Sequence, residues 1–311
     1  MPTTIKSIRV TDEAAKSVGR VVVALTGVSN KKVQGLFDHG CVKLNAQPCT
    51  HAAEHVNPGD EVEVSYDPTR GYPIKRRVWE DTAFTIVFED QHLIVVNKAA
   101  NVLTVETERG GDRNTLVARV SHYLKHTSRR REALVVHRLD RGVSGLLVFA
   151  KSRRVQEEVQ EQFKARKPER LYVAIVAGHL NRQSGTFRSH LATGKSLNQY
   201  STRDESEGEL AITHFKVQQK LADTTVVEVR LETGRRNQIR VHFADAGHPL
   251  LGDPRYGRSK SKHPRWPDHR IALHAQTLGF VHPATLKPLR FESELPKSFM
   301  WFITAEASRG K

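Results

Sequence analysis

The feature that most constrains the fold is a tight turn followed by an uninterrupted apolar run near the middle of the chain. Gly142 and Gly145 mark the turn, and every residue from 146 to 150 is apolar. Such a run beside glycines is typical of a strand that is buried on both faces. A single carboxylate, Asp140, precedes the turn with basic or imidazole side chains on both sides. An aspartate here often caps its own backbone, but it is also well placed for chemistry.

The length and charge of the chain narrow the class of protein. With 311 residues, of which 38% are hydrophobic, the chain is expected to form two domains with real cores. Its 49 Lys and Arg residues exceed 34 Asp and Glu residues, for a net charge of +15. An excess of this size along the whole chain indicates a polyanionic partner, which leaves RNA, DNA or an acidic membrane surface.

Membrane insertion, secretion and metal binding are not expected. No stretch approaches the eighteen or so apolar residues of a spanning helix, and the first ten residues lack the apolar core of a secretory signal. We therefore expect a cytoplasmic protein. Cys41 and Cys49 are too few for a zinc ribbon and are predicted to be free thiols. The pair His51 and His55 does not match a zinc-hydrolase helix, so neither metal nor cofactor is predicted.

Hydrophobic periodicity predicts a small N-terminal domain. Val18, Val22 and Leu25 recur at helical spacing, a second short helix is expected over residues 33–37, and strands are expected over 41–45 and 61–64. Glycine and prolines in residues 67–73 are typical of a linker. We predict domains over residues 1–75 and 76–311.

The larger domain is predicted to alternate strands with a few helices. Residues 181–210 are rich in polar residues and are expected to form surface loops with short strands. Strands are predicted over residues 84–88, 93–96, 170–178, 212–218 and 225–231, and helices over 115–126 and 152–163.

Several ordered motifs resemble those of the RluA-type pseudouridine synthases, between about residues 84 and 302. The segment from residue 137 to 148 is similar to the family signature HRLD-x-x-[TS]-S-G-L-L-V. Residues 170–178 resemble its (K/R)-x-Y-x-A-x-V-x-G motif, and residues 233–242 resemble T-G-R-x-H-Q-I-R-x-H. The resemblance implies an α+β fold, with a catalytic domain built on a mixed or antiparallel β-sheet.

The small domain resembles the RNA-binding module named after ribosomal protein S4. Residues 40–45 match its G-x-V-x-(V/L)-N strand, and residues 59–64 match G-D-x-V-x-V. The resemblance implies a small α/β domain in which Lys31 and Lys32 lie toward RNA phosphates. The same lysines would also suit an ordinary solvated helix face.

The resemblance to the synthases implies an isomerase that converts uridine in RNA to pseudouridine without a cofactor. Asp140 would stabilise or trap the sugar while the base is detached. It must stay ionised where water is excluded, so a cation has to offset the cost of desolvating the carboxylate. Arg235 is the expected partner, because a planar guanidinium holds a carboxylate in a fixed orientation. Tyr172 would stack on the uracil and is one candidate, with water, for the base that takes the C5 proton.

The residues around Asp140 are expected to meet the RNA. A base inside a stem must be flipped out to reach the carboxylate, and the resemblance implies that Arg138 fills the gap. His137 and Arg141 are expected to contact RNA beside it.

Two other functions remain open. A non-catalytic RNA-binding or ribosome-assembly factor would explain the departures from the family pattern at Ala99, Val143 and Asn237. A nucleic-acid hydrolase is disfavoured, since it generally needs clustered carboxylates for two metals. Large-subunit ribosomal RNA is the expected substrate, transfer RNA is the alternative, and a monomer is expected.

Overall fold

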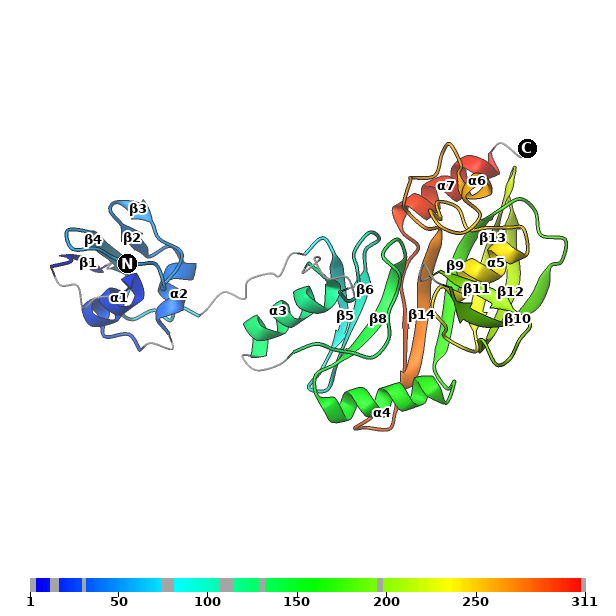
Figure 1. Ribbon diagram of the computed structural model, residues 1–311. Helices are drawn as coiled ribbons and strands as arrows, with labels where there is room; N and C mark the ends of the chain where they lie inside the picture. Colours follow the sequence, from blue (N-terminus) through cyan, green and yellow to red (C-terminus); the bar gives the residue numbers. More distant parts are fainter. Residues whose placement is uncertain are drawn as a thin grey trace. The chain divides into compact units, whose positions relative to one another are not determined.

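The chain folds as two units, Met1–Trp79 and Glu80–Lys311, in the computed structural model (Figure 1). Lys31 and the basic runs at residues 75–77 and 129–131 lie outside the described residues. The structure describes residues 4–11, 17–29, 32–73, 81–106, 114–128, 132–194 and 198–308.

The N-terminal unit packs two helices against a four-stranded antiparallel sheet, with strand order β1-β4-β2-β3. Val22, Phe37 and Val64 are fully or almost fully buried in its own core. Both expected helices form, and an edge strand that the sequence pattern did not reveal, β1, is added. The elements are β1 (Thr4–Arg9), α1 (Val18–Thr26), α2 (Val33–Asp38), β2 (Val42–Leu44), β3 (Gln47–Pro48) and β4 (Glu61–Tyr66).

The larger unit is built on an eleven-stranded mixed sheet, as the fold class implied. Its order is β11-β10-β12-β13-β9-β14-β8-β6-β5, with β15 on β14 and β7 on β8. The pair β14 and β8 is parallel. The strands are β5 (Phe84–Glu89), β6 (Leu93–Lys98), β7 (Leu134–Val135), β8 (Ser144–Ala150), β9 (Glu169–Ala177), β10 (Ser184–Thr193), β11 (Gln199–Thr202), β12 (Glu209–Lys220), β13 (Thr224–Leu231), β14 (Leu273–Val281) and β15 (Pro288–Glu292).

The apolar run in the middle of the chain is strand β8, and all of its residues are buried. Gly145 begins this run with φ of 120°, and a Cβ there would lie 2.3 Å from the carbonyl oxygen of Ala275. Only glycine allows β8 and β14 to approach this closely. The turn before β8 is therefore fixed against the centre of the sheet.

Five helices in the described part of the larger unit complete its fold. Val155 and Val159 of α4 pack on β6, β8 and β14, whereas Phe299 and Phe302 of α7 pack near β9. The helices are α3 (Leu116–Ser128), α4 (Arg153–Lys164), α5 (Gln238–Asp245), α6 (Arg258–Ser261) and α7 (Lys297–Ala307). Among the described residues, no helix is long and apolar enough to cross a bilayer.

One segment differs from its prediction. Residues 184–193, expected to be part of surface loops with short strands, form the ten-residue strand β10, which pairs with β11 and β12. Exposed residues alternate with half-buried ones over residues 184–189, because one face of this part of the strand is solvated. The serine and threonine content concealed the alternation.

Candidate active site

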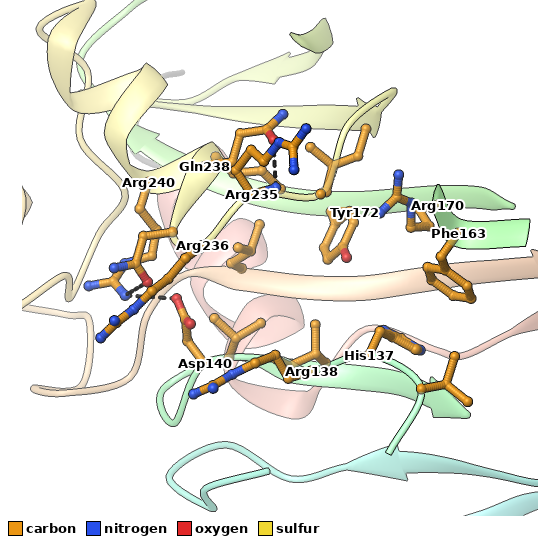
Figure 2. Close-up of a pocket in the computed structure, with 18 of the residues that line it drawn as sticks. His137, Arg138, Asp140, Phe163, Arg170, Tyr172, Arg235, Arg236, Gln238 and Arg240 are labelled. Carbon is orange, nitrogen blue, oxygen red and sulfur yellow. Dashed lines mark hydrogen bonds and ion pairs between the residues drawn. The ribbon is translucent and has the colours of Figure 1, made fainter. Parts of the chain in front are cut away.

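A pocket of about 440 Å³ lies between the turn before β8 and the turn before α5. Strands β9 and β14 supply Tyr172 and Leu273 to its lining, and the end of α4 supplies Phe163. Figure 2 shows that Asp140 and Arg240 lie near one end of this pocket, whereas Arg170 and Phe163 lie near the other. The volume is within the range of small-molecule sites and suits a nucleoside.

Asp140 makes an ion pair with Arg240, the third residue of α5. Its Oδ2 accepts a hydrogen bond from Arg240 Nη1 at 2.7 Å, and the Asp140 side chain is 26% exposed, compared with 8% for Arg240. No described residue donates to the other oxygen, Oδ1. The carboxylate is thus oriented through one oxygen, and the other is available to the pocket.

Arg240 is fixed from several sides at once. Its Nε and Nη2 donate to the two carboxylate oxygens of the fully buried Asp253, at 2.7 and 2.9 Å. Asn237 accepts from Nη1 at 2.9 Å and donates to the Tyr256 hydroxyl, and the guanidinium stands over the Tyr256 ring. Burial lowers the pKa of Arg240, but its hydrogen bonds to Asp253 and the charges of both carboxylates raise the pKa above its usual value. The arginine is a permanent cation that two carboxylates share.

The expected pairing of Asp140 with Arg235 needs correction. Arg235 lines the same pocket, but its Nη1 bonds to Glu209 Oε1 at 2.6 Å. The reason is the position of the helix start. Arg235 lies in the turn before α5 and its side chain bonds to Glu209 and Leu210 at the start of β12, whereas Arg240 lies in the first helical turn, which faces Asp140. The motif contains both Arg235 and Arg240. The sequence alone did not show which of these two arginines pairs with Asp140.

Two buried cations hold the turn that carries Asp140. Arg270 Nη1 donates to the carbonyl oxygen of Gly142 at 2.8 Å, and Nη2 donates to Ser144 Oγ at 2.7 Å. Lys98 Nζ donates to the carbonyl oxygens of Val102 at 2.7 Å and Arg141 at 3.3 Å. Burial and the nearby Arg270 charge lower the pKa of Lys98 to about 7, although Asp140 opposes this shift. Neither cation's role was predicted.

Tyr172 lies on β9 within the pocket and is 7% exposed. Burial raises the pKa of its phenol, with Arg170 opposing and Asp140 adding to the increase. The phenol therefore stays protonated at neutral pH. This disfavours Tyr172 as a ready base but is compatible with contact between its ring and a pyrimidine.

The three RNA-contact candidates beside Asp140 differ in their surroundings. Arg138 lines the pocket and is exposed, whereas Arg141 is exposed but is not part of the pocket lining. His137 instead stacks on Phe163 and accepts a hydrogen bond at Nε2 from the backbone N–H of Val148. Burial lowers the pKa of His137 to about 3, with Arg170 adding to the effect. The neutral imidazole offers no charge to a phosphate, so its part is to support the pocket wall. Lys32, in the other unit, is exposed.

The departures from the family pattern leave the ion pair intact. Val143 is buried in the turn, and Asn237 adopts a left-handed conformation with φ of 55° just before α5. The backbone N–H of Ala99, which a proline would lack, donates to the carbonyl oxygen of Ala83 at 2.8 Å. Each departure is accommodated locally.

One group outside the pocket has ligand atoms at metal-site spacing, namely Asp223, His263 and Glu306. The backbone N–H of Arg265 donates to His263 Nδ1 at 3.2 Å, and His263 Nε2 lies 3.4 Å from Asp223 Oδ1. The imidazole that accepts at Nδ1 carries its proton on Nε2. Arg265 also pairs with Glu306 at 3.3 Å. These residues do not fit a metal ion in this arrangement.

The mixed sheet holds a nucleoside-sized pocket in which one carboxylate, Asp140, is oriented by an arginine. These features are typical of an enzyme that acts on a single nucleoside. The family model described as RNA pseudouridylate synthase matches residues 92–245. The chain is 34% identical over 287 residues to ribosomal large subunit pseudouridine synthase D of Zymomonas mobilis, covering 88% of each protein. It is also 34% identical over 278 residues to the uncharacterized RNA pseudouridine synthase YlyB of Bacillus subtilis, again covering 88% of each.

A solved structure shows the same fold. Human RNA pseudouridylate synthase domain containing 4 has a TM-score of 0.58 at 20% identity, over 72% of this chain and 92% of that one. The chain belongs to the RNA pseudouridine synthase family. It is an isomerase that converts uridine in RNA to pseudouridine.

Proposed function

We propose that this synthase modifies large-subunit ribosomal RNA and that Asp140 is its catalytic nucleophile. The observation that carries the role of Asp140 is its geometry. One carboxylate oxygen is held by Arg240 at 2.7 Å, and the other has no partner among the described residues. A carboxylate fixed in this way can approach the sugar at C1′ while the base leaves.

Sharing Arg240 between Asp140 and Asp253 suits this role. A guanidinium paired with Asp140 alone would neutralise it and weaken it as a nucleophile. Here the forked side of the guanidinium is engaged by Asp253, so the three groups keep one net negative charge. Asp140 is thereby oriented without losing its reactivity.

The target uridine is proposed to enter with its ring against Tyr172 and its sugar toward Asp140. Arg138, exposed at the rim, would fill the gap left in the RNA stem. Arg236 is exposed and lines the pocket, so it is placed to meet a flanking phosphate. The exposed Arg141, next to Asp140 in the chain, would meet another. No metal or cofactor is required, because the reaction breaks the N1–C1′ bond and forms a C5–C1′ bond without redox change.

The N-terminal unit is proposed to be an S4-like RNA-binding domain, with Lys32 among its phosphate contacts. Its two helices and small sheet, with strands at the predicted positions, support this. The relatives named ribosomal large subunit pseudouridine synthase D, which match along most of this chain, favour ribosomal over transfer RNA. A cytoplasmic monomer completes the proposal.

The test is tritium release from RNA labelled at uridine C5. We expect wild-type protein to release tritium from unmodified large-subunit RNA, and Asp140→Asn to reduce release by roughly a thousandfold or more while RNA binding persists. Asp268→Asn, an exposed aspartate, is the matched control. Activity that survives in Asp140→Asn would remove the nucleophile, and release only from transfer RNA would change the target.

A further inference from the structure

Arg170 is a buried cation at the far end of the pocket from Asp140. It is 7% exposed, precedes Tyr172 by two residues on β9, and lines the cavity (Figure 2). Among the described residues, no carboxylate pairs with it and its Nε has no hydrogen-bond partner. Its guanidinium donates one long hydrogen bond, from Nη2 to the carbonyl oxygen of Glu232 at 3.3 Å.

Packing holds this guanidinium in place. It stands over the Phe163 ring, 5.6 Å from the centroid, and His137 stacks on the same ring as a neutral imidazole. Gly234 lies against it, since a Cβ there would be 2.5 Å from Nη1. A glycine at this position gives the guanidinium room beside the turn that precedes α5.

An uncompensated buried cation is unfavourable in the free protein. Burial accordingly lowers the pKa of Arg170, and Tyr172 opposes this. A partner that brings an oxygen acceptor into the pocket would supply what the protein does not. Phosphates stay with the RNA backbone at the rim, so the acceptor that reaches this depth belongs to the base.

We propose that Arg170 binds a carbonyl oxygen of the target uracil and stabilises the negative charge on the ring while it is detached from the sugar. This deepens the proposed function, because it rests on a base placed between Asp140 and Tyr172. When the N1–C1′ bond breaks, its electron pair stays with the ring and spreads onto O2 and O4. A fixed cation at that position acts where charge develops.

The same site accounts for the turn of the base. Rejoining forms the C5–C1′ bond, C5 loses a proton and N1 gains one, so atoms and charge balance. The turn about the N3–C6 axis exchanges the positions of O2 and O4. One donor can therefore meet a carbonyl oxygen before and after the turn. Cytosine would present its amino group in one of the two orientations, so Arg170 also selects uracil.

The first experiment compares Arg170→Met and Arg170→Lys with Arg230→Met in the full chain. Arg230 is exposed on β13 and pairs in register with Leu171, so it is a matched control. The substrate is a pool of large-subunit and transfer RNA transcripts labelled with tritium at uridine C5. We expect Arg170→Met to slow release at saturating RNA by about 100-fold, with RNA affinity unchanged and a Tm equal to or above that of wild type. Arg170→Lys should be intermediate, and Arg230→Met should match wild type.

The stability readout separates a role in catalysis from one in folding. If Arg170→Met keeps the wild-type rate, or loses rate, affinity and Tm together, the proposal is wrong. A wild-type protein without turnover on the pool contradicts the proposed function instead, whereas an active wild type with an equally active Arg170→Met contradicts only the role of Arg170.

The second experiment tests the carbonyl contact directly. Transcripts carry a small fraction of 4-thiouridine or 2-thiouridine, and mass spectrometry compares thiolated pseudouridine with ordinary pseudouridine among the products. Sulfur is a weaker acceptor than oxygen, so wild type should disfavour at least one thiolated uridine, and Arg170→Met should lose that preference. The same ratio in both proteins would overturn the proposed contact.

Discussion

At the scale of single residues, the site depends on one cation shared by two acids. Arg240 is held by Asp253 through both oxygens and by Asn237 and Tyr256, and it presents its remaining donor to Asp140. The position of the Asp140 carboxylate is thus set in part by Asp253 and Tyr256, which do not line the pocket. Such support is what keeps a catalytic group within a fraction of an ångström of its working geometry.

Asp253→Asn should therefore lower the rate with little effect on RNA affinity. The amide keeps the shape but loses the charge, so Arg240 would pair fully with Asp140 and its position would loosen. We expect kcat for tritium release to fall by about tenfold to a hundredfold with KM nearly unchanged. Asp253→Glu should also have a low kcat, because its longer side chain would displace the Arg240 guanidinium. An unchanged kcat, or a rise in KM alone, would contradict this role.

At the scale of elements, the start of α5 decides which arginine meets the carboxylate. Asn237 precedes the helix with φ of 55°, a conformation that asparagine tolerates better than most residues. It places Arg235 in the turn and Arg240 in the first helical turn. The start of α5 is therefore part of the proposed active site.

Two substitutions at Asn237 separate backbone strain from side-chain contacts. Both Asn237→Gly and Asn237→Ala remove the hydrogen bonds to Arg240 and Tyr256, but only alanine adds left-handed strain. We expect the alanine variant to have a lower free energy of unfolding than the glycine variant by about 1 kcal/mol, measured by urea denaturation. Equal stabilities would show that the local backbone relaxes.

The pairing of β8 with β14 should make the larger unit sensitive to acid. His274 Nδ1 lies 2.8 Å from Ser144 Oγ and Nε2 lies 2.7 Å from Ser293 Oγ. Burial, with Arg270 adding, lowers the pKa of His274 to about 4. Between pH 6.5 and 4 the unfolded chain binds this proton and the folded chain does not, so stability is lost as pH falls through this window.

Urea unfolding at several pH values tests this dependence. For His274 alone, the slope approaches about 1.4 kcal/mol per pH unit. His274→Gln should flatten the acid decline, whereas substituting the exposed His179 in the same way should not. His242, with its pKa lowered to about 4 by burial, adds in the same direction in all variants. An identical decline in wild type and His274→Gln would rule out this contribution.

At the scale of the whole molecule, the chain has a net charge of +15 and consists of two units, each with its own core. Val22 and Phe37 lie in the core of the first unit, and the larger unit has its own clusters around β8 and β9. The larger unit should therefore fold without the first.

Deleting residues 1–79 should weaken RNA binding and leave the chemistry in place. We expect lower affinity and a shallower dependence of binding on salt, by about 0.7 to 0.9 in the log–log slope for each lost phosphate contact. Single-turnover tritium release at saturating RNA should persist. Lys32→Glu in the full chain is the companion variant and should reduce the slope less. An unchanged slope would argue against an RNA role for the first unit.

The sequence by itself determined the elements and the chemistry. The apolar run of β8, the glycines beside it and the helical spacing of α1 and α4 are short-range patterns, and they fixed local structure because each depends on neighbouring residues. The ordered motifs predicted the synthase family, which the comparisons confirm, and they singled out Asp140 as the candidate nucleophile. Even so, the polar composition of residues 184–193 concealed β10, whose alternation depends on a sheet that forms only in the folded protein.

Only the tertiary structure decided which side chains meet. Arg235 and Arg240 lie five residues apart in one motif, and the helix that starts between them sends their side chains in different directions. Asp140 and Arg240 are one hundred residues apart, and the unpaired state of Arg170 depends on every element around it. Contacts of this kind follow from packing across the sheet, so they cannot be predicted from a pattern along the chain.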